Sequence, residues 1–516
     1  KQKIFKSCFF IGAQYIHIFM TLCIIVSINN IINSQEIDIK PNQRKSIHGQ
    51  WSSRLIFIFA ATGSAVGLGN IWKFPWMTSE YGGGAFVLIY ILSVILIALP
   101  IMIAEVLIGR HGKQNPVGSI KYLSNKSSTF NIKEIEPDLN RIKTKSQKYS
   151  NADDYTNWQL VGWSGMIAGI LILSFYSVIA GWTMSYIFKA ISGSFVEISV
   201  DQSKQVFEDF ISDPEKLLGW HTIFMLLTCY IISKGVKGGL EKSVKILIPG
   251  LFILLIGLAF YTSTLSGFLD GLEYMFVPDI SKIDASVILG AMGMAFFSLS
   301  IGMGSLMIYG SYLSDESSIA NVTGVVAFAD TFVAILAGII IFPIVFTYNL
   351  DPSTAGPGLI FQTLPIAFGA MPGGIVIATL FFILLFFAAI TSSISLIEPA
   401  ITYMIEKYSI SRPEASVRLG VLTWTLGIGT ILSFSYAADL TLFGYTFFDL
   451  LDNFTSKIML PLGGLLIAIF TGFIVKRNIV FDELNLTNLQ FNFWRLLVRF
   501  IAPIAVTLIF INGIIS

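Results

Sequence analysis

Two glycine- and serine-rich interruptions divide long hydrophobic stretches of this sequence. Residues 63–70 (GSAVGLGN) divide the stretch 51–76, and residues 300–304 (SIGMG) divide the stretch 286–313. Backbone groups that leave a helix lose their hydrogen bonds, and within a membrane they are tolerated only where protein buries them or where they line a wet cavity. A matching pair of interrupted spans predicts a secondary transporter with inverted repeats and a binding site near the middle of the bilayer. The alternative for 63–70 is a glycine-rich packing seam between helices, in which Asn70 and Lys73 would be poorly placed.

Polar side chains inside other hydrophobic stretches add candidate ligands. Asp330 lies within Val325–Val333 (VVAFADTFV), and an aspartate near the centre of a membrane helix costs at least ~2.5 kcal/mol, which favours a functional carboxylate. The alternative is an aspartate near a helix end that reaches water. Thr391 and Ser392 are either oxygen ligands for a hard cation or hydroxyls that pack between membrane helices.

The composition requires a membrane to position these residues. Hydrophobic residues make up 54% of the 516 and charged residues only 13%, with a mean hydropathy of +0.74, whereas soluble domains carry roughly 25% charged residues. A span needs about 20 mostly apolar residues. We therefore predict an all-α polytopic membrane protein with eleven core helices, at 51–76, 84–109, 159–190, 220–234, 241–264, 286–313, 320–347, 372–405, 415–436, 447–475 and 490–515.

Charge asymmetry between the connecting loops predicts the orientation. The loop 110–158 holds nine Lys or Arg, whereas 191–219 holds two Lys and six acids. Because cytoplasmic loops carry the excess of Lys and Arg, we expect 110–158 and the amino terminus of the core to be cytoplasmic. Residues 1–50 are expected to be an extension, either a signal-like segment or the product of a mis-set start.

The remaining chemistry-bearing residues do not indicate an enzyme. The three cysteines, Cys8, Cys23 and Cys229, lie in apolar stretches without metal-ligand spacing, and the four histidines cluster with no nucleophile or metal ligand. Without a disulfide framework or a large external domain, a bacterial cytoplasmic membrane is expected.

Several motifs resemble those of the neurotransmitter:sodium symporter family. They are WSSR at 51–54, the run 63–75, GGGAF at 82–86, EVLIGR at 105–110, Phe175-Tyr176 with Trp182, FFSLS at 296–300, YGSY at 309–312 and TSS at 391–393. The resemblance covers about 51–516. It implies the leucine-transporter fold, a 5+5 inverted repeat with helices 1 and 6 broken at the midplane. The first repeat is then 51–264, the second is 286–475, and 476–516 holds a linker and helix 11.

The same resemblance implies two sodium sites. The first consists of the Ala65 carbonyl, Asn70, Ser298 and Asp330, with the substrate carboxylate as a further ligand. The second consists of the carbonyls of Gly63, Val66 and Ala388 and the hydroxyls of Thr391 and Ser392. Chloride-dependent relatives carry a neutral residue in place of Asp330 and polar ligands in place of Met294 and Ala334, so no chloride is expected.

Gly67 bears on the substrate, since amine transporters of the family carry an aspartate there. An amino acid that brings its own carboxylate is therefore expected. The resemblance implies a substrate site formed by Ala65, Leu68, Gly69, Ile172, Tyr176, Phe297, Ser298, Ser300, Met303, Ser392 and Leu396. Gly302-Met303-Gly304 resembles bacterial members that admit bulky hydrophobic substrates, which indicates large aliphatic or aromatic L-amino acids.

Charged pairs are expected to gate the two sides. The resemblance assigns Lys73 and Asp452 to the outer gate, with Lys73 in place of the usual arginine, and Trp51, Tyr312 and Glu406 to the inner gate. The arginine expected three residues before Trp51 is His48, and Arg44 is the alternative partner. Gly239 and Pro249, separated by nine residues, indicate either a segment that unwinds to wet the second sodium site or an ordinary proline kink.

Together these observations predict a sodium-coupled, chloride-independent symporter of hydrophobic L-amino acids that works by alternating access. The expected partners are the amino acid, two sodium ions and the lipid bilayer, with no nucleic acid, in a monomer or weak oligomer. The alternatives are an osmolyte or other small-substrate carrier of the same family, or a substrate sensor or channel that does not transport.

Overall fold

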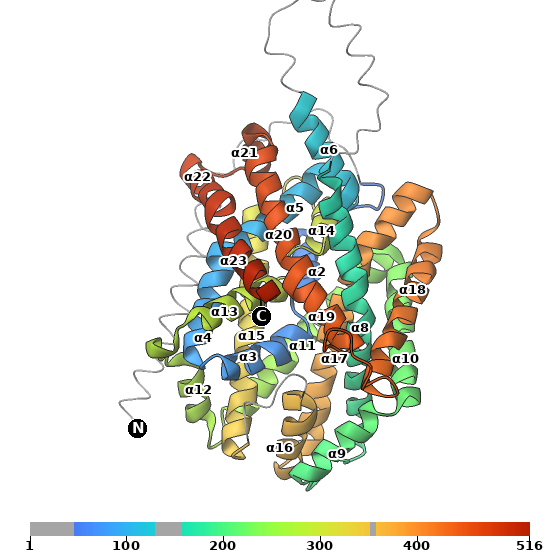
Figure 1. The fold of residues 1–516 in the computed structure, drawn as a ribbon, viewed down its shortest axis with the longest axis vertical. Helices are drawn as coiled ribbons and strands as arrows, with labels where there is room; N and C mark the ends of the chain where they lie inside the picture. Colours follow the sequence, from blue (N-terminus) through green and yellow to red (C-terminus); the bar gives the residue numbers. More distant parts are fainter. Residues whose placement is uncertain (1–45, 130–156, 351–357, 516) are drawn as a thin grey trace, which may run out of the picture.

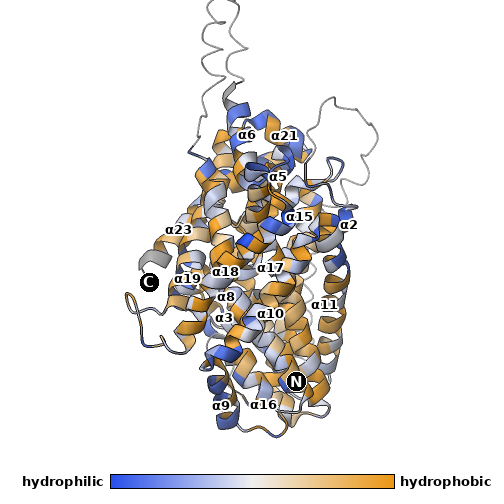
Figure 2. Cartoon of the chain, turned by 90° about the vertical axis from the view of Figure 1, so that its right-hand side faces the viewer, coloured by the Kyte–Doolittle hydropathy of each residue, from blue (hydrophilic) through white to orange (hydrophobic). Residues whose placement is uncertain are grey.

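The computed structural model describes residues 46–129, 157–350 and 358–515, and within these ranges the regular secondary structure is helical. Most helices run roughly along the long axis of one bundle (Figure 1). The helices α6 and α21 lie at one end, and α9 and α16 lie at the other. Hydrophobic residues dominate the middle of the bundle and hydrophilic residues gather toward its two ends (Figure 2), as a protein that crosses a bilayer requires.

The elements of the first half, in chain order, are α2 (Arg54–Ala65), η1 (Gly69–Lys73), α3 (Phe74–Glu80), α4 (Gly84–Ser93), η2 (Val94–Ala98), α5 (Leu99–Gly112), α6 (Pro116–Thr129), α8 (Gln159–Ile191), α9 (Val200–Ile211), α10 (Pro214–Ser233), η4 (Val236–Leu240), α11 (Glu241–Thr262) and α12 (Phe268–Phe276). Those of the second half are η5 (Ile280–Lys282), α13 (Ala285–Ser298), α14 (Ser305–Ser311), α15 (Ile319–Thr347), η6 (Leu359–Thr363), α16 (Leu364–Ala370), α17 (Gly374–Tyr408), α18 (Arg412–Phe434), α19 (Phe447–Asn453), η7 (Phe454–Met459), α20 (Leu460–Ile469), η8 (Phe470–Ile474), α21 (Arg477–Leu484), α22 (Asn488–Leu496), η9 (Leu497–Ile501) and α23 (Ala502–Ile515).

The long apolar helices coincide with the predicted spans. Among the described residues, nine helices are long and apolar enough to cross a bilayer, and a tenth is the pair Arg54–Ala65 and Gly69–Glu80, bent by 55°. The remaining predicted span, 286–313, is divided between α13 and α14. The all-α membrane fold is confirmed, while the count of eleven spans and the division into repeats stay predictions.

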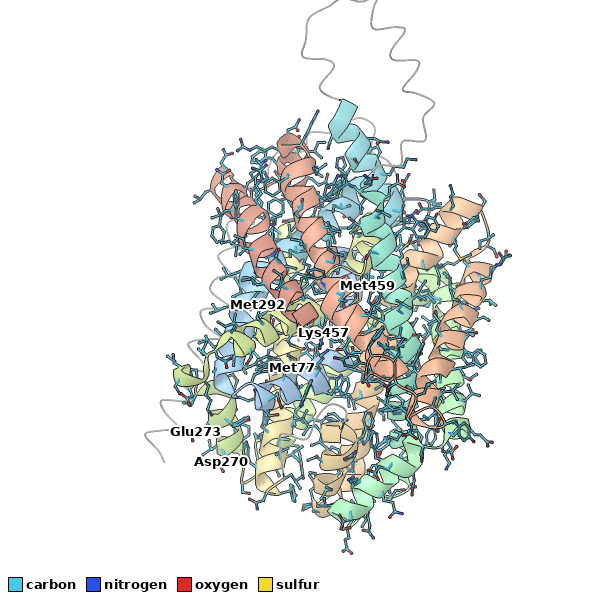
Figure 3. The ribbon with its side chains drawn as sticks, in the orientation of Figure 1. Met77, Asp270, Glu273, Met292, Lys457 and Met459 are labelled. Atoms are coloured by element: carbon cyan, nitrogen blue, oxygen red, sulfur yellow. The ribbon has the colours of Figure 1, made fainter. Side chains whose placement is uncertain are left out.

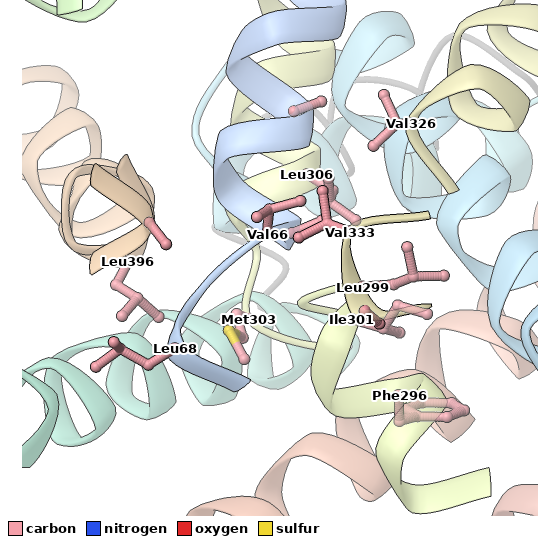
Figure 4. Packing of buried hydrophobic residues seen from close by; sticks show 14 of the residues in the cluster. Val66, Leu68, Phe296, Leu299, Ile301, Met303, Leu306, Val326, Val333 and Leu396 are labelled. Atoms are coloured by element: carbon pink, nitrogen blue, oxygen red, sulfur yellow. The ribbon is translucent and has the colours of Figure 1, made fainter. Parts of the chain in front are cut away.

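Both interruptions are irregular backbone buried inside the bundle. Val66, at the end of α2, has φ −69° and ψ 108°, outside helical geometry. Between α13 and α14, Gly302 and Gly304 have φ +85° and +76°, conformations that favour glycine. Ser300 also has a positive φ, of 54°. The two interruptions contact each other, since Ser300 Oγ donates to the Ser64 carbonyl at 2.8 Å. Figure 4 shows Val66 and Leu68 of the first and Met303 of the second among the buried side chains of this region.

The sequence analysis missed five shorter helices, α6, α9, α12, α16 and α21, because a search for long apolar stretches passes over short or amphipathic segments. Helix α9 begins with a capping box, in which the side chains of Ser199 and Gln202 each accept a hydrogen bond from the other residue's backbone N–H. The acids Asp270 and Glu273 of α12 lie at the edge of the bundle (Figure 3), away from the interruptions.

Candidate substrate and sodium sites

A group of buried polar side chains joins the first interruption to α13 and α15. The Asn70 amide donates to Asp330 Oδ1 at 2.7 Å, and Ser298 Oγ donates to Asp330 Oδ2 at 2.5 Å. Tyr90 shares a hydrogen bond of 3.0 Å with Ser298. None of the ion pairs within the described ranges involves Asp330. The carboxylate at this carboxylate site (Asn70, Ser298, Asp330) is thus held by neutral donors alone.

Asn70 also orders the broken backbone itself. Its side-chain Oδ1 accepts a hydrogen bond from the Gly67 backbone amide at 3.0 Å, and its backbone N–H donates to the Gly67 carbonyl at 3.2 Å. Of the four predicted ligands of the first sodium ion, the structure therefore joins Asn70, Ser298 and Asp330 by hydrogen bonds, and Ala65 lines the adjacent cavity.

A second group of oxygen atoms lies where α17 packs against the end of α2. Ser392 Oγ lies 3.3 Å from the Gly63 carbonyl and 3.1 Å from the Val66 carbonyl. Thr391 Oγ1 donates to the Ala388 carbonyl at 3.1 Å. The five residues predicted to bind the second sodium ion therefore form one cluster, the hydroxyl site, which contains no charged side chain.

A cavity of about 30 Å³ lies between the two interruptions, α8 and α17. It is lined by ten of the eleven predicted substrate residues, namely Ala65, Gly69, Ile172, Tyr176, Phe297, Ser298, Ser300, Met303, Ser392 and Leu396. The exception is Leu68, whose amide donates to the Tyr176 hydroxyl at 3.3 Å. The volume suffices for about two water molecules, so an amino acid requires the pocket to widen. Met303, between two glycines with positive φ, is suited to such a movement.

Gly67 and Gly69 bring the backbone close to the other walls of this cavity. A Cβ at position 67 would lie 2.8 Å from Ser392 Oγ and 3.2 Å from the Tyr176 hydroxyl, and one at position 69 would lie 2.6 Å from the Phe297 ring. These glycines therefore leave backbone groups, rather than side chains, facing a small ligand.

Comparison with known proteins decides the family. The model of the sodium:neurotransmitter symporter family matches residues 48–132 and 207–516. The chain belongs to this family. It is 34% identical over 473 residues to the sodium-dependent transporter YhdH of Bacillus subtilis, which covers 90% of this chain and 98% of YhdH. The crystal structure of MhsT in complex with L-phenylalanine superposes with a TM-score of 0.79 and 42% identity, covering 90% of this chain and 99% of MhsT.

A human relative, the sodium-dependent neutral amino acid transporter SLC6A17, is 26% identical over 323 residues, 57% of this chain and 40% of that protein. This chain is accordingly a multi-pass, sodium-dependent transporter, and its relatives are transporters rather than enzymes.

At the outer-gate positions of this symporter, the two predicted partners do not form an ion pair. Lys73 Nζ lies over the Phe297 ring, 4.2 Å from its centroid. Asp452 on α19 forms no ion pair with Lys73 in the described ranges, and its backbone carbonyl accepts from the Ser456 hydroxyl at 2.6 Å. The roof of the pocket in this conformation is thus a cation–π contact.

The inner-gate positions form a denser network of polar and aromatic contacts. Trp51 packs edge-on against Tyr312 and donates to the Tyr309 carbonyl at 3.1 Å. Tyr312 donates to Glu398 Oε1 at 2.7 Å, and Glu398 also pairs with Arg412. The predicted stand-in for the missing arginine, Arg44, lies outside the described residues.

His48 occupies the position of that arginine and contacts Glu406, with Nε2 2.9 Å from Oε1. Asn115 holds the same carboxylate through its backbone amide at 2.9 Å and its side-chain amide at 2.6 Å. The inner end is therefore closed by several polar contacts.

Three further residues were missed by sequence reasoning. Glu105 Oε1 accepts from the Gly302 amide at 2.6 Å and so holds the second interruption. Glu241 at the start of α11 accepts from the Ser52 amide and hydroxyl at 2.7 and 2.9 Å, next to Trp51. The Ser64 carbonyl accepts from Ser300 Oγ at 2.8 Å and links the two interruptions. An EVLIGR motif contains Glu105, but its pairing with a residue about 200 positions away has no local sequence signal.

Proposed function

We propose that this chain couples the entry of two sodium ions to the uptake of a large hydrophobic L-amino acid, without chloride. The observation that carries the proposal is the composition of the central cavity. One side of it is apolar, with Ile172, Met303 and Leu396, and the other side is broken backbone with Asn70 and Ser298 in front of Asp330. A hydrophobic amino acid matches both sides, because its side chain fits the apolar side and its charged ammonium and carboxylate groups fit the polar side.

The carboxylate site favours a cation. Asp330 is fully buried, and a buried charge that lacks a partner of opposite sign costs several kcal/mol. A sodium ion among Asp330, Asn70, Ser298 and the Ala65 carbonyl supplies that partner with the oxygen ligands that a hard cation prefers. The hydroxyl site offers a second set of oxygens.

Chloride independence follows from the same charges. Met294 and Ala334 have no polar side-chain atoms except a thioether, and both are buried. With Asp330 as a fixed negative charge, the site has no need of a mobile anion. One relative with chloride in its name, the GABA transporter ine of Drosophila melanogaster, is 23% identical to this chain over 417 residues.

Gly67 supports an amino acid rather than an amine. Position 67 has neither a carboxylate nor room for one, because even a Cβ would lie within 3.2 Å of two oxygens. The substrate carboxylate is then held by the amides of Leu68 and Gly69, by Tyr176 and by sodium. The MhsT complex contains L-phenylalanine, which agrees with a bulky apolar substrate.

The driving force is sufficient for concentrative uptake. Two sodium ions with a neutral zwitterion carry two charges, worth about 4.6 kcal/mol at about 100 mV, or on the order of a thousandfold accumulation before the sodium gradient is added. We place the protein in a bacterial cytoplasmic membrane with the α6 end, which carries Lys113, Lys121 and Lys126, in the cytoplasm.

Counterflow in proteoliposomes tests this function. Vesicles loaded with unlabelled leucine should accumulate labelled leucine only when sodium is present on both sides. A sensor would bind leucine without exchange, and an osmolyte carrier would exchange glycine betaine instead of leucine. Exchange of tryptamine as fast as tryptophan would contradict the role given to the substrate carboxylate.

A further inference from the structure

A second, larger cavity of about 660 Å³ lies near the α6 end of the molecule, apart from the central pocket. The first turn of α6, the first turns of α8 and the last turns of α17 form its walls. Glu406 of the inner gate forms part of its lining, but the proposed transport cycle assigns no ligand to it. Its lining combines hydrogen-bond donors, positive charge and aromatic rings, and each of these points to the same class of ligand.

The lining holds one unpartnered donor, a side-chain amide, and the start of a helix lies in the same wall. Gln159 is only 7% exposed and lines the cavity, yet its Nε2 has no hydrogen-bond partner among the described residues. A buried donor without a partner costs about 1–3 kcal/mol, so a ligand with acceptor oxygens would relieve it. Val117 and Gly118, in the first turn of the 14-residue helix α6, line the same cavity. The Gly118 amide already donates to Asn115 Oδ1 at 3.0 Å, so this turn contributes the field of its helix dipole, which favours an anion.

The charged residues of the lining carry an excess of positive charge. Three lysines (Lys113, Lys121, Lys407) and one acid (Glu406) line the cavity, which leaves two positive charges. Glu406 is already held by His48 and Asn115, and Lys113 pairs with Asp315. Lys407 is exposed and takes part in none of the ion pairs found in the described ranges.

One wall of the cavity continues into a surface that suits lipid chains. Leu160, Trp163 and Ile167 are 66%, 37% and 45% exposed, and their spacing of three and four residues places them on one face of α8. Trp163 itself lines the cavity and contacts Tyr403, with ring centroids 4.5 Å apart. Tryptophan and tyrosine are enriched at the level of lipid headgroups.

We propose that the cavity binds the phosphodiester headgroup of an anionic phospholipid, with its acyl chains along the Leu160–Trp163–Ile167 face. The Gln159 amide and Lys407 receive the phosphate oxygens beside the positive end of the α6 dipole, and Trp163 marks the boundary with the hydrocarbon. The ligand would hold α6 against α17 beside the His48–Glu406 contact of the inner gate.

The test is a titration of the full-length protein in neutral detergent with short-chain phosphatidylglycerol, short-chain phosphatidylcholine and inorganic phosphate, followed by thermal unfolding. The variants are Gln159→Leu and Lys407→Gln. Lys204→Gln is the matched control, since Lys204 is an exposed lysine on α9, at the opposite end of the molecule. Unfolding in phosphatidylcholine alone shows whether each variant is folded.

Phosphatidylglycerol should stabilise the wild type more than phosphatidylcholine does. Each cavity variant should weaken the apparent affinity for phosphatidylglycerol about tenfold, as expected for one lost hydrogen bond to a charged group. Lys204→Gln should behave as the wild type. Equal stabilisation by the two lipids, equal affinity in the cavity variants, or stabilisation by inorganic phosphate but not by phosphatidylglycerol would overturn the proposal.

Discussion

The carboxylate site and the hydroxyl site both contact the same broken helix and differ in charge. At the first, Asn70 and Ser298 hold Asp330, a full negative charge, with neutral donors. At the second, Ser392 and Thr391 contact backbone carbonyls, and no residue of the site is charged. We infer that a cation at the first site compensates a buried charge, whereas one at the second gains only dipolar ligands, so the second ion is the more weakly held.

A half-buried carboxylate elsewhere in the molecule sharpens the comparison, because a cation of the chain itself, Arg110, pairs with it. Glu483 on α21 accepts from Arg110 Nε at 2.5 Å and from His111 Nδ1 at 2.8 Å. Burial raises its pKa, but hydrogen bonds from His111 and the charge of Arg110 outweigh burial and lower the pKa to about 2. Asp330 pairs with no cation of the described residues, and we therefore propose that it depends on an ion from outside the protein.

The largest expected effect is that of Asp330→Asn. It keeps the size of the side chain but removes the charge that offsets the cation. Loss of one partner of a buried charge pair costs about 3 kcal/mol, so sodium-driven leucine uptake should fall about a hundredfold. The measurement is initial uptake into proteoliposomes, with protein folding checked by thermal unfolding. Wild-type uptake by this variant in gluconate medium would remove Asp330 from the ion site.

A smaller effect is expected at the hydroxyl site. Thr391→Val combined with Ser392→Ala removes two neutral ligands, worth about 1 kcal/mol net, and should raise the half-saturating sodium concentration about fivefold. Ser393→Ala is the matched control, since Ser393 bonds to the Ile390 carbonyl and Thr228 instead. An unchanged sodium titration in the double variant would refute the site.

The self-compensated carboxylate should affect stability instead of transport. Because the folded pKa of Glu483 is lowered, its contribution to stability is present above its ordinary pKa of 4.5 and is lost as pH falls toward about 2. Glu483→Gln should therefore lower the unfolding temperature at pH 7, and the difference from wild type should shrink below about pH 4.5. Thermal unfolding across this pH range provides the measurement. A difference that is constant with pH would contradict the paired state.

The smallest effect is expected at the roof of the pocket. Lys73→Ala removes the cation–π contact with Phe297, worth about 0.5–1 kcal/mol, and should speed substrate release about twofold to fivefold. Lys73→Arg retains the contact and serves as the control. A much larger change would indicate that Lys73 pairs with Asp452 in another conformation of the cycle.

The long spans and the central residues could be predicted from sequence, whereas the network at the inner end could not. Asp330 and Thr391 are polar within apolar stretches, and glycines mark the interruptions, so each has a local signal. The pairing of Glu398 with Arg412 and Tyr312 depends on how α17, α18 and α14 pack. Glu241 and Ser52 are 189 residues apart, and nothing in either segment alone indicates that they meet.

The most direct test is leucine uptake by the wild-type protein in proteoliposomes with an inward sodium gradient, an interior-negative potential and gluconate as the only external anion. The account predicts concentrative uptake that disappears when potassium replaces sodium and is unchanged when chloride replaces gluconate. Uptake that needs chloride, or that persists without sodium, would contradict it.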